Sequence, residues 1–255
     1  MNLLDKLLVA CRQIQHTPNR LIRLIRHSDV GNLAYHFTEV KASLSDVAHS
    51  KEAQEFIKKL DEMSEPSTKK WTDGNVQRWL STILKVDLKA NCKILEIGSY
   101  EGRSTNFWLM VFPKASIICV DTWEGGDEHK DISSDAHADM NTVFNRFVKN
   151  TKWTSDRIYI CRSPSYLFFS SPENSKDFDL IYIDGSHHGA DVIQDAISGF
   201  NSLKTGGIMI FDDFLWRYYE NPNQNPWAAL NFFIRLFERD MKVLRFGEQV
   251  HIQKI

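Results

Sequence analysis

The chain has 255 residues, a formal net charge of −2 and a hydrophobic fraction of 42%. A chain of this length can bury a sizeable core, and it has no basic excess that would indicate a nucleic-acid partner. Its apolar runs are far shorter than the roughly 20 residues of a membrane span, and the N-terminus has no small-residue cleavage site. We therefore expect a cytoplasmic globular protein without stable membrane insertion.

Residues 1–65 differ in pattern from the rest of the chain. "LLDKLLVACRQI", "NRLIRLIRH" and "SKEAQEFIKKLDEM" place apolar residues at helical spacing, which predicts an N-terminal extension of two or three amphipathic helices. Basic side chains in residues 1–27 would let such a helix lie on an anionic membrane. Packing against the main domain, or against a second copy in a homo-oligomer, is the favoured interpretation. The polar loop 64–70 marks a boundary, and residues 71–255 form the predicted main domain.

The main domain begins with a helical pattern, "WTDGNVQRWLSTIL", in which Trp71, Trp79 and Leu80 are predicted core contacts. Short apolar runs then alternate with helices: "KILEIG", "SIICVD", "DRIYICR", "DLIYID" and "GGIMIFDD" are the predicted strands. This alternation is typical of a parallel sheet covered on both faces. At the end, "KVLRF" and "QVHIQKI" are joined by Gly247 and Glu248, which predicts a hairpin and an antiparallel strand at the sheet edge.

The first strand-to-helix turn reads "EIGSYEGRST", residues 96–105. In a doubly wound sheet, ligands bind beyond the carboxyl ends of the strands, and Gly98 and Gly102 would let the backbone approach a ligand closely. The turn lacks the GxGxxG spacing that receives a diphosphate, and Glu96 suits a ligand with a positive or zwitterionic group. Asp121 ends the second strand, where an acid can bind both ribose hydroxyls; capping a helix is its alternative role.

Three carboxylates follow neighbouring strands. Asp184 ends the fourth strand, and Asp212 and Asp213 end the fifth. Three unpaired charges would repel one another and raise their own pKa values, whereas a divalent cation resolves the conflict. Carboxylates suit Mg²⁺, Mn²⁺ or Ca²⁺. The alternative is that Asp212 and Asp213 serve only as turn and cap residues. Asp191 and Asp195 lie at helical spacing further on and are interpreted as a solvated face.

His187 is the predicted general base, since a histidine has the appropriate pKa near neutrality. Its alternative roles are to cap the following helix or to orient a ligand, and His188 is interpreted as a bystander. Two long polar segments, residues 123–141 and 215–227, follow strand ends and are expected to carry specificity or to act as lids. Trp216, Tyr218 and Tyr219 in the second segment could stack on an acceptor or pack the lid against the body.

Over roughly residues 71–255 the sequence resembles class I S-adenosylmethionine-dependent methyltransferases. The resemblance depends on "LEIGSYEGRST", "ICVDTWEGG", "YIDGSHH", "LKTGGIMIFDDF" and the terminal strand pair. Within that superfamily the chain looks most like metal-dependent O-methyltransferases of sugars and natural-product hydroxyls, and more distantly like catechol O-methyltransferase. It departs from several of them at Ser186, where they carry an acid that could act as base.

The resemblance implies a Rossmann-like α/β fold with strand order 3-2-1-4-5-7-6 and the last strand antiparallel. It also implies S-adenosylmethionine as cofactor, Mg²⁺ as metal and a small sugar-like acceptor, whose hydroxyl the cation would orient toward the sulfonium methyl and make more acidic. By this resemblance Gly98 would face the methionine part, Asp121 the ribose and the loop 163–166 the adenine.

The implied roles fall into three sets. The cofactor-binding set is Glu96, Gly98, Ser99, Tyr100, Gly102, Ser104, Asp121, Thr122, Trp123, Ser163, Ser165 and Asp184. The metal set is Asp184, Asp212 and Asp213. The catalytic set is His187 and Asp184.

Three rival functions follow from the same residues. A metal-independent methyltransferase would use His187 as base and keep its activity after metal removal. A nicotinamide-dependent oxidoreductase is disfavoured by the missing GxGxxG and by the terminal hairpin. A non-catalytic interaction protein would keep the fold and use the N-terminal helices as its interface.

Overall fold

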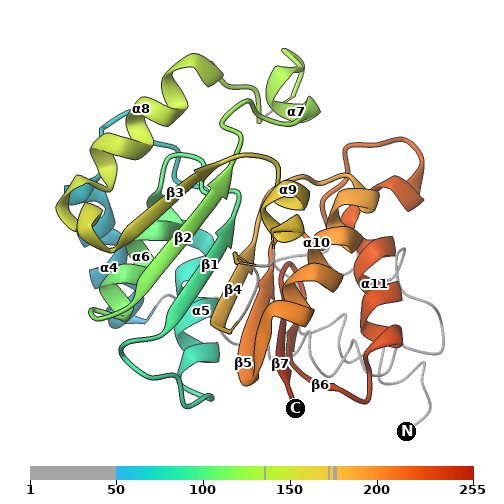
Figure 1. The fold of residues 1–255 in the computed structure, drawn as a ribbon. Helices are drawn as coiled ribbons and strands as arrows, with labels where there is room; N and C mark the ends of the chain where they lie inside the picture. The colour runs from blue at the N-terminus through green and yellow to red at the C-terminus, as the bar shows by residue number, and fades with distance from the viewer. Residues whose placement is uncertain (1–49, 135, 172, 175–176) are drawn as a thin grey trace, which may run out of the picture.

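Seven strands form one mixed sheet in the order β3-β2-β1-β4-β5-β7-β6 (Figure 1). Strands β1 to β5 run parallel, and β7 lies antiparallel between β5 and β6. The predicted strand order and terminal hairpin are therefore confirmed. The strands are β1 (Lys93–Ile97), β2 (Ser116–Asp121), β3 (Ile158–Arg162), β4 (Phe178–Ile183), β5 (Leu203–Phe211), β6 (Met241–Phe246) and β7 (Val250–Lys254).

The computed structural model describes residues 50–134, 136–171, 173–174 and 177–255. The helices predicted before residue 50, and an oligomer contact through them, lie outside these residues. No helix in the described ranges is both long enough and apolar enough to cross a membrane. The helices are α4 (Lys51–Met63), α5 (Asp73–Ile83), α6 (Arg103–Val111), α7 (Asp127–Lys130), α8 (Met140–Asn150), α9 (Ser165–Ser170), α10 (Gly189–Ser202) and α11 (Pro226–Leu236), with 3-10 turns η2 (Lys152–Arg157) and η3 (Pro222–Gln224).

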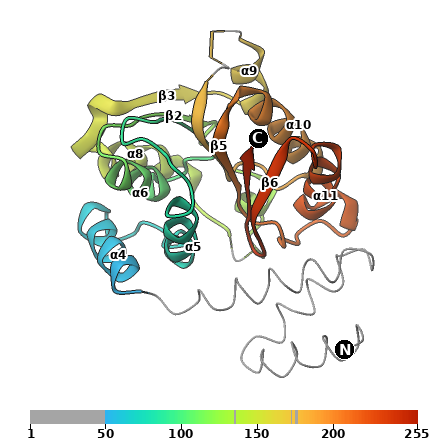
Figure 2. The same cartoon turned by 90° about the horizontal axis from the view of Figure 1, so that it is seen from below.

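Helices cover both faces of the sheet (Figures 1 and 2). Because successive strand side chains point to opposite faces, Leu95 and Ile97 of β1 join the hydrophobic cluster under α9, α10 and α11. Ile94 of the same strand joins the cluster under α4, α5, α6 and α8. Nearly continuous apolar strands are what a sheet buried on two faces requires.

The segment before the sheet is fixed to the main domain. Helix α4 packs its buried Leu60 into the same cluster as α5 and α6. Arg103, whose side chain is only 3% exposed, joins three helices because its guanidinium donates to Asp61 of α4 at 2.8 Å and to Asp73 of α5 at 2.6 Å. The loop between α4 and α5 is also anchored, since the Lys69 backbone N–H donates to the Glu101 carboxylate at 2.7 Å.

One predicted core contact is wrong. Trp79 is fully buried and Leu80 is 5% exposed, but Trp71 is 50% exposed. Trp71 precedes α5, so it escapes the apolar face of that helix. Its ring lies beside Tyr100 instead, with ring centroids 5.2 Å apart, at the carboxyl end of the sheet.

Candidate active site

The carboxyl ends of β1 and β4 approach each other closely at Gly98. The Asp184 backbone N–H donates to the Ile97 carbonyl at 2.8 Å, which extends the β1–β4 pairing into the loop after β4. Gly98 has φ +84°, and a Cβ at this position would lie 2.0 Å from the Asp184 carbonyl oxygen. Only glycine fits both this left-handed conformation and this contact. The turn after β1 therefore lies directly against the loop that carries Asp184.

A cavity of about 750 Å³ opens at this end of the sheet. Its size falls within the range of roughly 300–1,000 Å³ for small-molecule sites. Nine residues of the predicted cofactor set line it: Gly98, Ser99, Tyr100, Ser104, Asp121, Thr122, Ser163, Ser165 and Asp184. The predicted metal and catalytic residues Asp212, Asp213 and His187 line the same cavity.

Three residues of the predicted cofactor set lie behind the cavity wall. Glu96 shares the β1 face with Ile94, so its carboxylate points toward α6, where Thr105 donates to it. It is fully buried, and burial raises its pKa to about 7, so it does not offer the ligand an exposed charge. Trp123 is 2% exposed and donates from Nε1 to the Tyr100 carbonyl at 2.7 Å. A Cβ at Gly102 would lie 2.6 Å from Thr151, so this glycine serves packing.

Asp121 holds the first turn in place. Its Oδ2 accepts a hydrogen bond from the Tyr100 N–H at 2.8 Å, and its Oδ1 accepts one from the Trp123 N–H at 2.7 Å. Burial raises the pKa of Asp121, although these backbone donors oppose the shift. The Ser99 backbone is a third donor to this carboxylate. A carboxylate offers about four lone-pair positions, so about one position remains for a ligand hydroxyl.

The interpretation of Asp195 as part of a solvated face is wrong. Its residue exposure is 2%, and burial raises its pKa to about 7. Asp191 is exposed and accepts a hydrogen bond from the Ser186 hydroxyl at 2.7 Å. The two acids are four residues apart, but the Asp195 side chain has Ser165 of α9 as its partner.

Asp184, Asp212 and Asp213 meet at the sheet edge, but their surroundings differ. Asp212 Oδ2 accepts hydrogen bonds from the Tyr182 hydroxyl at 2.5 Å and from Asn75 Nδ2 at 2.8 Å, and its Oδ1 accepts one from the Asp213 N–H at 2.8 Å. Asp184 and Asp213 have side chains 30% and 39% exposed toward the cavity. Asp213 has a left-handed φ of +52°, a strained conformation that is typical of functional sites.

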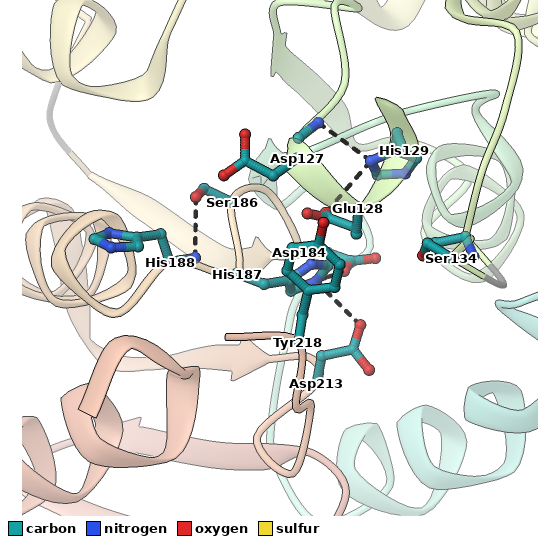
Figure 3. A network of polar contacts seen from close by, with 12 residues as sticks. Asp127, Glu128, His129, Ser134, Asp184, Ser186, His187, His188, Asp213 and Tyr218 are labelled. Atoms are coloured by element: carbon teal, nitrogen blue, oxygen red, sulfur yellow. Dashed lines mark hydrogen bonds and ion pairs between the residues drawn. The ribbon is translucent and has the colours of Figure 1, made fainter. Parts of the chain in front are cut away.

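His187 lies between three carboxylates (Figure 3). Its Nε2 is 3.1 Å from Asp213 Oδ2 and 3.9 Å from Asp184 Oδ1. Its Nδ1 is 3.0 Å from Oε1 of Glu128, a residue of α7 whose side chain is 2% exposed. The N-cap of α10 is His188, not His187, so the capping role considered for His187 is excluded.

These contacts set the charges in the cluster. Burial alone would lower the pKa of His187, but its interactions with Asp184, Asp213 and Glu128 raise it well above the usual value. Burial also opposes ionisation of Glu128, yet hydrogen bonds with His129 and His187 lower its pKa strongly. Burial and the neighbouring charges of Asp184 and Asp213 raise the pKa of Asp212 well above its usual value. His187 therefore holds a proton in this arrangement, and a protonated imidazole cannot accept another.

The two long polar segments, residues 123–141 and 215–227, contact each other beside the cavity. The Tyr218 hydroxyl donates to Asp131 at 2.9 Å, and the Tyr219 hydroxyl donates to Asp127 at 3.3 Å. Two of the three aromatic residues considered as acceptor contacts thus join the segments to each other, although Tyr219 also lines the cavity. Trp216 lines it as well, with its ring centroid 5.2 Å from that of His187.

Three residues of the cluster are not among those predicted from the sequence: Glu128, Asn75 and Tyr182. Glu128 lies within a polar segment where many acids look alike, and the four-residue helix α7 is too short to produce a periodic pattern. Asn75 lies more than 100 residues from Asp212 along the chain, so only the packing of α5 brings them together. Tyr182 was the one polar group in the apolar run before Asp184, and that hydroxyl was a usable signal.

Comparisons with known proteins agree with this architecture. Residues 95–214 match the model of a family described as a methyltransferase domain. No curated protein sequence matches the chain. A putative O-methyltransferase from Klebsiella pneumoniae has a similar structure, with a TM-score of 0.50, 12% identity, and coverage of 87% of this chain and 97% of that one.

Two further solved structures are similar. The O-methyltransferase TomG from Streptomyces achromogenes, involved in tomaymycin synthesis and in complex with SAM, has a TM-score of 0.52 and 12% identity, with coverage of 87% of this chain and 97% of that one. The MycE methyltransferase from the mycinamycin biosynthetic pathway, in complex with Mg and SAH, has a TM-score of 0.52 and 16% identity. The match covers 78% of this chain and 54% of MycE. At these identities the structural likeness establishes the fold.

Proposed function

We propose, from its fold and its match over residues 95–214, that the chain is a class I S-adenosylmethionine-dependent methyltransferase that methylates a hydroxyl oxygen of a small acceptor. The acceptor class that we propose is a sugar or a glycosylated metabolite. One observation carries the proposal: a single cavity contains both the glycine turn with Asp121 and the acidic cluster of Asp184 and Asp213. A methyl donor and a cation-bound hydroxyl could therefore lie side by side.

The cofactor would occupy the part of the cavity formed by the ends of β1, β2 and β3. Gly98 lets the turn after β1 lie against the Asp184 loop, and both line this part of the cavity. Asp121 keeps an acceptor position for a ribose hydroxyl. The Ser163–Ser165 turn lines the cavity after β3, where the adenine is expected. Holding donor and nucleophile in line supplies much of the acceleration, since effective molarities can reach about 10⁵ M.

The acidic edge fits a divalent cation. Asp184 and Asp213 both line the cavity with partly exposed carboxylates, and oxygen ligands of this kind suit Mg²⁺, Mn²⁺ or Ca²⁺. When bound, the cation would hold the acceptor hydroxyl and lower its pKa. Asp212, the third residue of the expected metal set, is already hydrogen-bonded by Tyr182 and Asn75. We propose that Asp212 positions Asp184 and Asp213 and does not itself bind the cation.

Trp216 and Tyr219 would enclose the acceptor and exclude water. Both line the cavity, and the bonds from Tyr218 to Asp131 and from Tyr219 to Asp127 hold their segment over the opening. Aromatic faces suit the apolar face of a sugar ring or a planar acceptor. The acids along the cavity wall disfavour an acceptor that carries negative charge.

The rival function is metal-independent transfer with His187 as base. It is favoured by one contact, because Glu128 fixes the His187 ring so that Nε2 points toward Asp184 and Asp213. A transfer assay with methyl-labelled S-adenosylmethionine and a panel of sugars and glycosides separates the two functions. The metal-dependent enzyme loses transfer in EDTA and regains it with Mg²⁺ or Mn²⁺, whereas the rival is unaffected by EDTA. Transfer only to nitrogen or carbon acceptors would contradict both.

A further inference from the structure

We propose that His187 is a metal ligand through Nε2, forming with Asp184 and Asp213 a mixed nitrogen and oxygen site that prefers Mn²⁺ to Mg²⁺. The inference rests on the proposed cation-dependent function and changes two expectations from the sequence. His187 becomes a ligand in place of the general base, and Asp212 becomes a positioning residue in place of a ligand.

The geometry of the three side chains favours this set. Asp184, His187 and Asp213 each offer one ligand atom, and these atoms lie within 4.8 Å of one another. Nε2 is 3.1 Å from Asp213 Oδ2 and 3.9 Å from Asp184 Oδ1. An ion about 2.1 Å from each ligand separates adjacent ligand atoms by about 3 Å, so small side-chain adjustments would close the site.

Glu128 completes the arrangement on the other side of the ring. A histidine that binds a metal usually donates its second ring N–H to a carboxylate, and Nδ1 of His187 lies 3.0 Å from Glu128 Oε1. Since an ionised carboxylate only accepts hydrogen bonds, Nδ1 is the donor. Nε2 is buried and makes no hydrogen bond within the described part of the chain, despite its closeness to Asp213. The free ring nitrogen is therefore the one aimed at both carboxylates.

Asp212 is occupied. Tyr182, Asn75 and the Asp213 N–H donate to it at 2.5, 2.8 and 2.8 Å. These three donors take three of the roughly four lone-pair positions of a carboxylate. Oδ2, which accepts from both Tyr182 and Asn75, could bind an ion only if one of these donors left. Since Tyr182 also lies 2.9 Å from Asp184 Oδ2, Asp212 instead helps to position a ligand.

The donor set decides which ion fits best. Mg²⁺ prefers oxygen ligands and a near-ideal octahedron, whereas imidazole suits transition metals. One nitrogen and two carboxylates therefore favour Mn²⁺ over Mg²⁺. Replacing the imidazole by a third carboxylate should reverse the preference.

Calorimetric titration of the full chain with MnCl₂ and with MgCl₂, in the presence of S-adenosylhomocysteine, tests the set. His187→Gln and Asp213→Asn should each weaken Mn²⁺ binding by about 10- to 100-fold, and Glu128→Gln by about 10-fold. Asp212→Asn removes a positioning residue and not a ligand, so it should weaken Mn²⁺ binding less than Asp213→Asn does. His187→Asp should bind Mg²⁺ relatively better than the parent does.

Pulsed electron paramagnetic resonance of the Mn²⁺-loaded protein gives a readout independent of activity. Nitrogen coupling should be present in the parent and in Asp212→Asn, and absent in His187→Asp. Three results overturn the inference: no nitrogen coupling in the parent, a loss in Asp212→Asn as large as in Asp213→Asn, or no metal binding. The homocysteine-nucleoside heat in the same titrations shows that each variant is folded and tests the methyltransferase assignment separately.

Discussion

Gly98→Ala should damage both stability and cofactor binding. The new Cβ would lie 2.0 Å from the Asp184 carbonyl oxygen, 2.4 Å from its carbon and 2.7 Å from Gly185 Cα, all of which are backbone atoms. The left-handed conformation alone costs alanine about 1–2 kcal/mol, and forcing two backbone segments apart adds about 1–3 kcal/mol. Unfolding in urea should therefore show a loss of about 2–5 kcal/mol.

Two other glycines provide matched controls. Gly206 has φ +83°, and a Cβ added there would meet no atom within 4 Å, so Gly206→Ala should lose only the conformational part, about 1–2 kcal/mol. A Cβ added at Gly74 in α5 would meet no atom within 4 Å, and this glycine has no left-handed φ. Gly74→Ala should therefore raise the free energy of unfolding by about 0.4–1 kcal/mol. Calorimetry should show at least a tenfold loss of S-adenosylhomocysteine affinity for Gly98→Ala alone. Equal losses of stability in Gly98→Ala and Gly206→Ala would refute the close-contact argument.

Further predictions concern side chains around the site. Because burial raises the Glu96 pKa to about 7, its contribution to stability is complete below the ordinary value near 4.5 and is lost as pH rises toward 7. Urea titrations at pH 5 and pH 8 measure how far the free energy of unfolding falls between these pH values. Glu96→Gln should make this fall smaller by up to about 3 kcal/mol, and the remainder is due to Asp195. The same fall in the parent and in Glu96→Gln would contradict the role given to Glu96. Tyr182→Phe removes a hydrogen bond to buried carboxylates and should cost about 1.5–3 kcal/mol in unfolding without changing nucleoside affinity; a neutral result would show that the carboxylates find another donor. Tyr218→Phe breaks the bond to Asp131 and should raise the acceptor KM several-fold at unchanged S-adenosylhomocysteine affinity; an unchanged KM would show that the segment stays closed without it.

The sheet was predictable because its signals are local and repeated. Four of the five parallel strands, all but β3, are apolar runs that end at a glycine or an acid, and the hairpin after α11 is marked by Gly247. The resemblance supplied the order of the strands, which a single sequence does not encode in any one segment. The prediction that Trp71 is a core contact was wrong because a helical pattern does not show where the helix begins. Helix α5 starts at Asp73 and leaves Trp71 outside the core.

The site was predictable at strand ends and unpredictable elsewhere. Asp121, Asp184 and Asp213 follow strands, so their positions follow from the topology, and all three line the cavity. Glu96 lies inside a strand, where alternation put it on the α6 face instead. The contact between Glu128 and His187 joins helix α7 to the loop after β4, 59 residues further along the chain. Only the packing of side chains in the folded chain determines such a contact.

We propose that this chain binds S-adenosylmethionine at the carboxyl ends of β1 and β2 and transfers its methyl group. Calorimetric titration of the metal-stripped full chain with S-adenosylhomocysteine tests it directly, with Asp121→Asn as the matched variant. We expect binding by the parent and an affinity about 10- to 100-fold lower in Asp121→Asn, the loss for one hydrogen bond to a charged group. A folded parent that binds no nucleoside would contradict the account and favour a non-catalytic interaction protein on this fold.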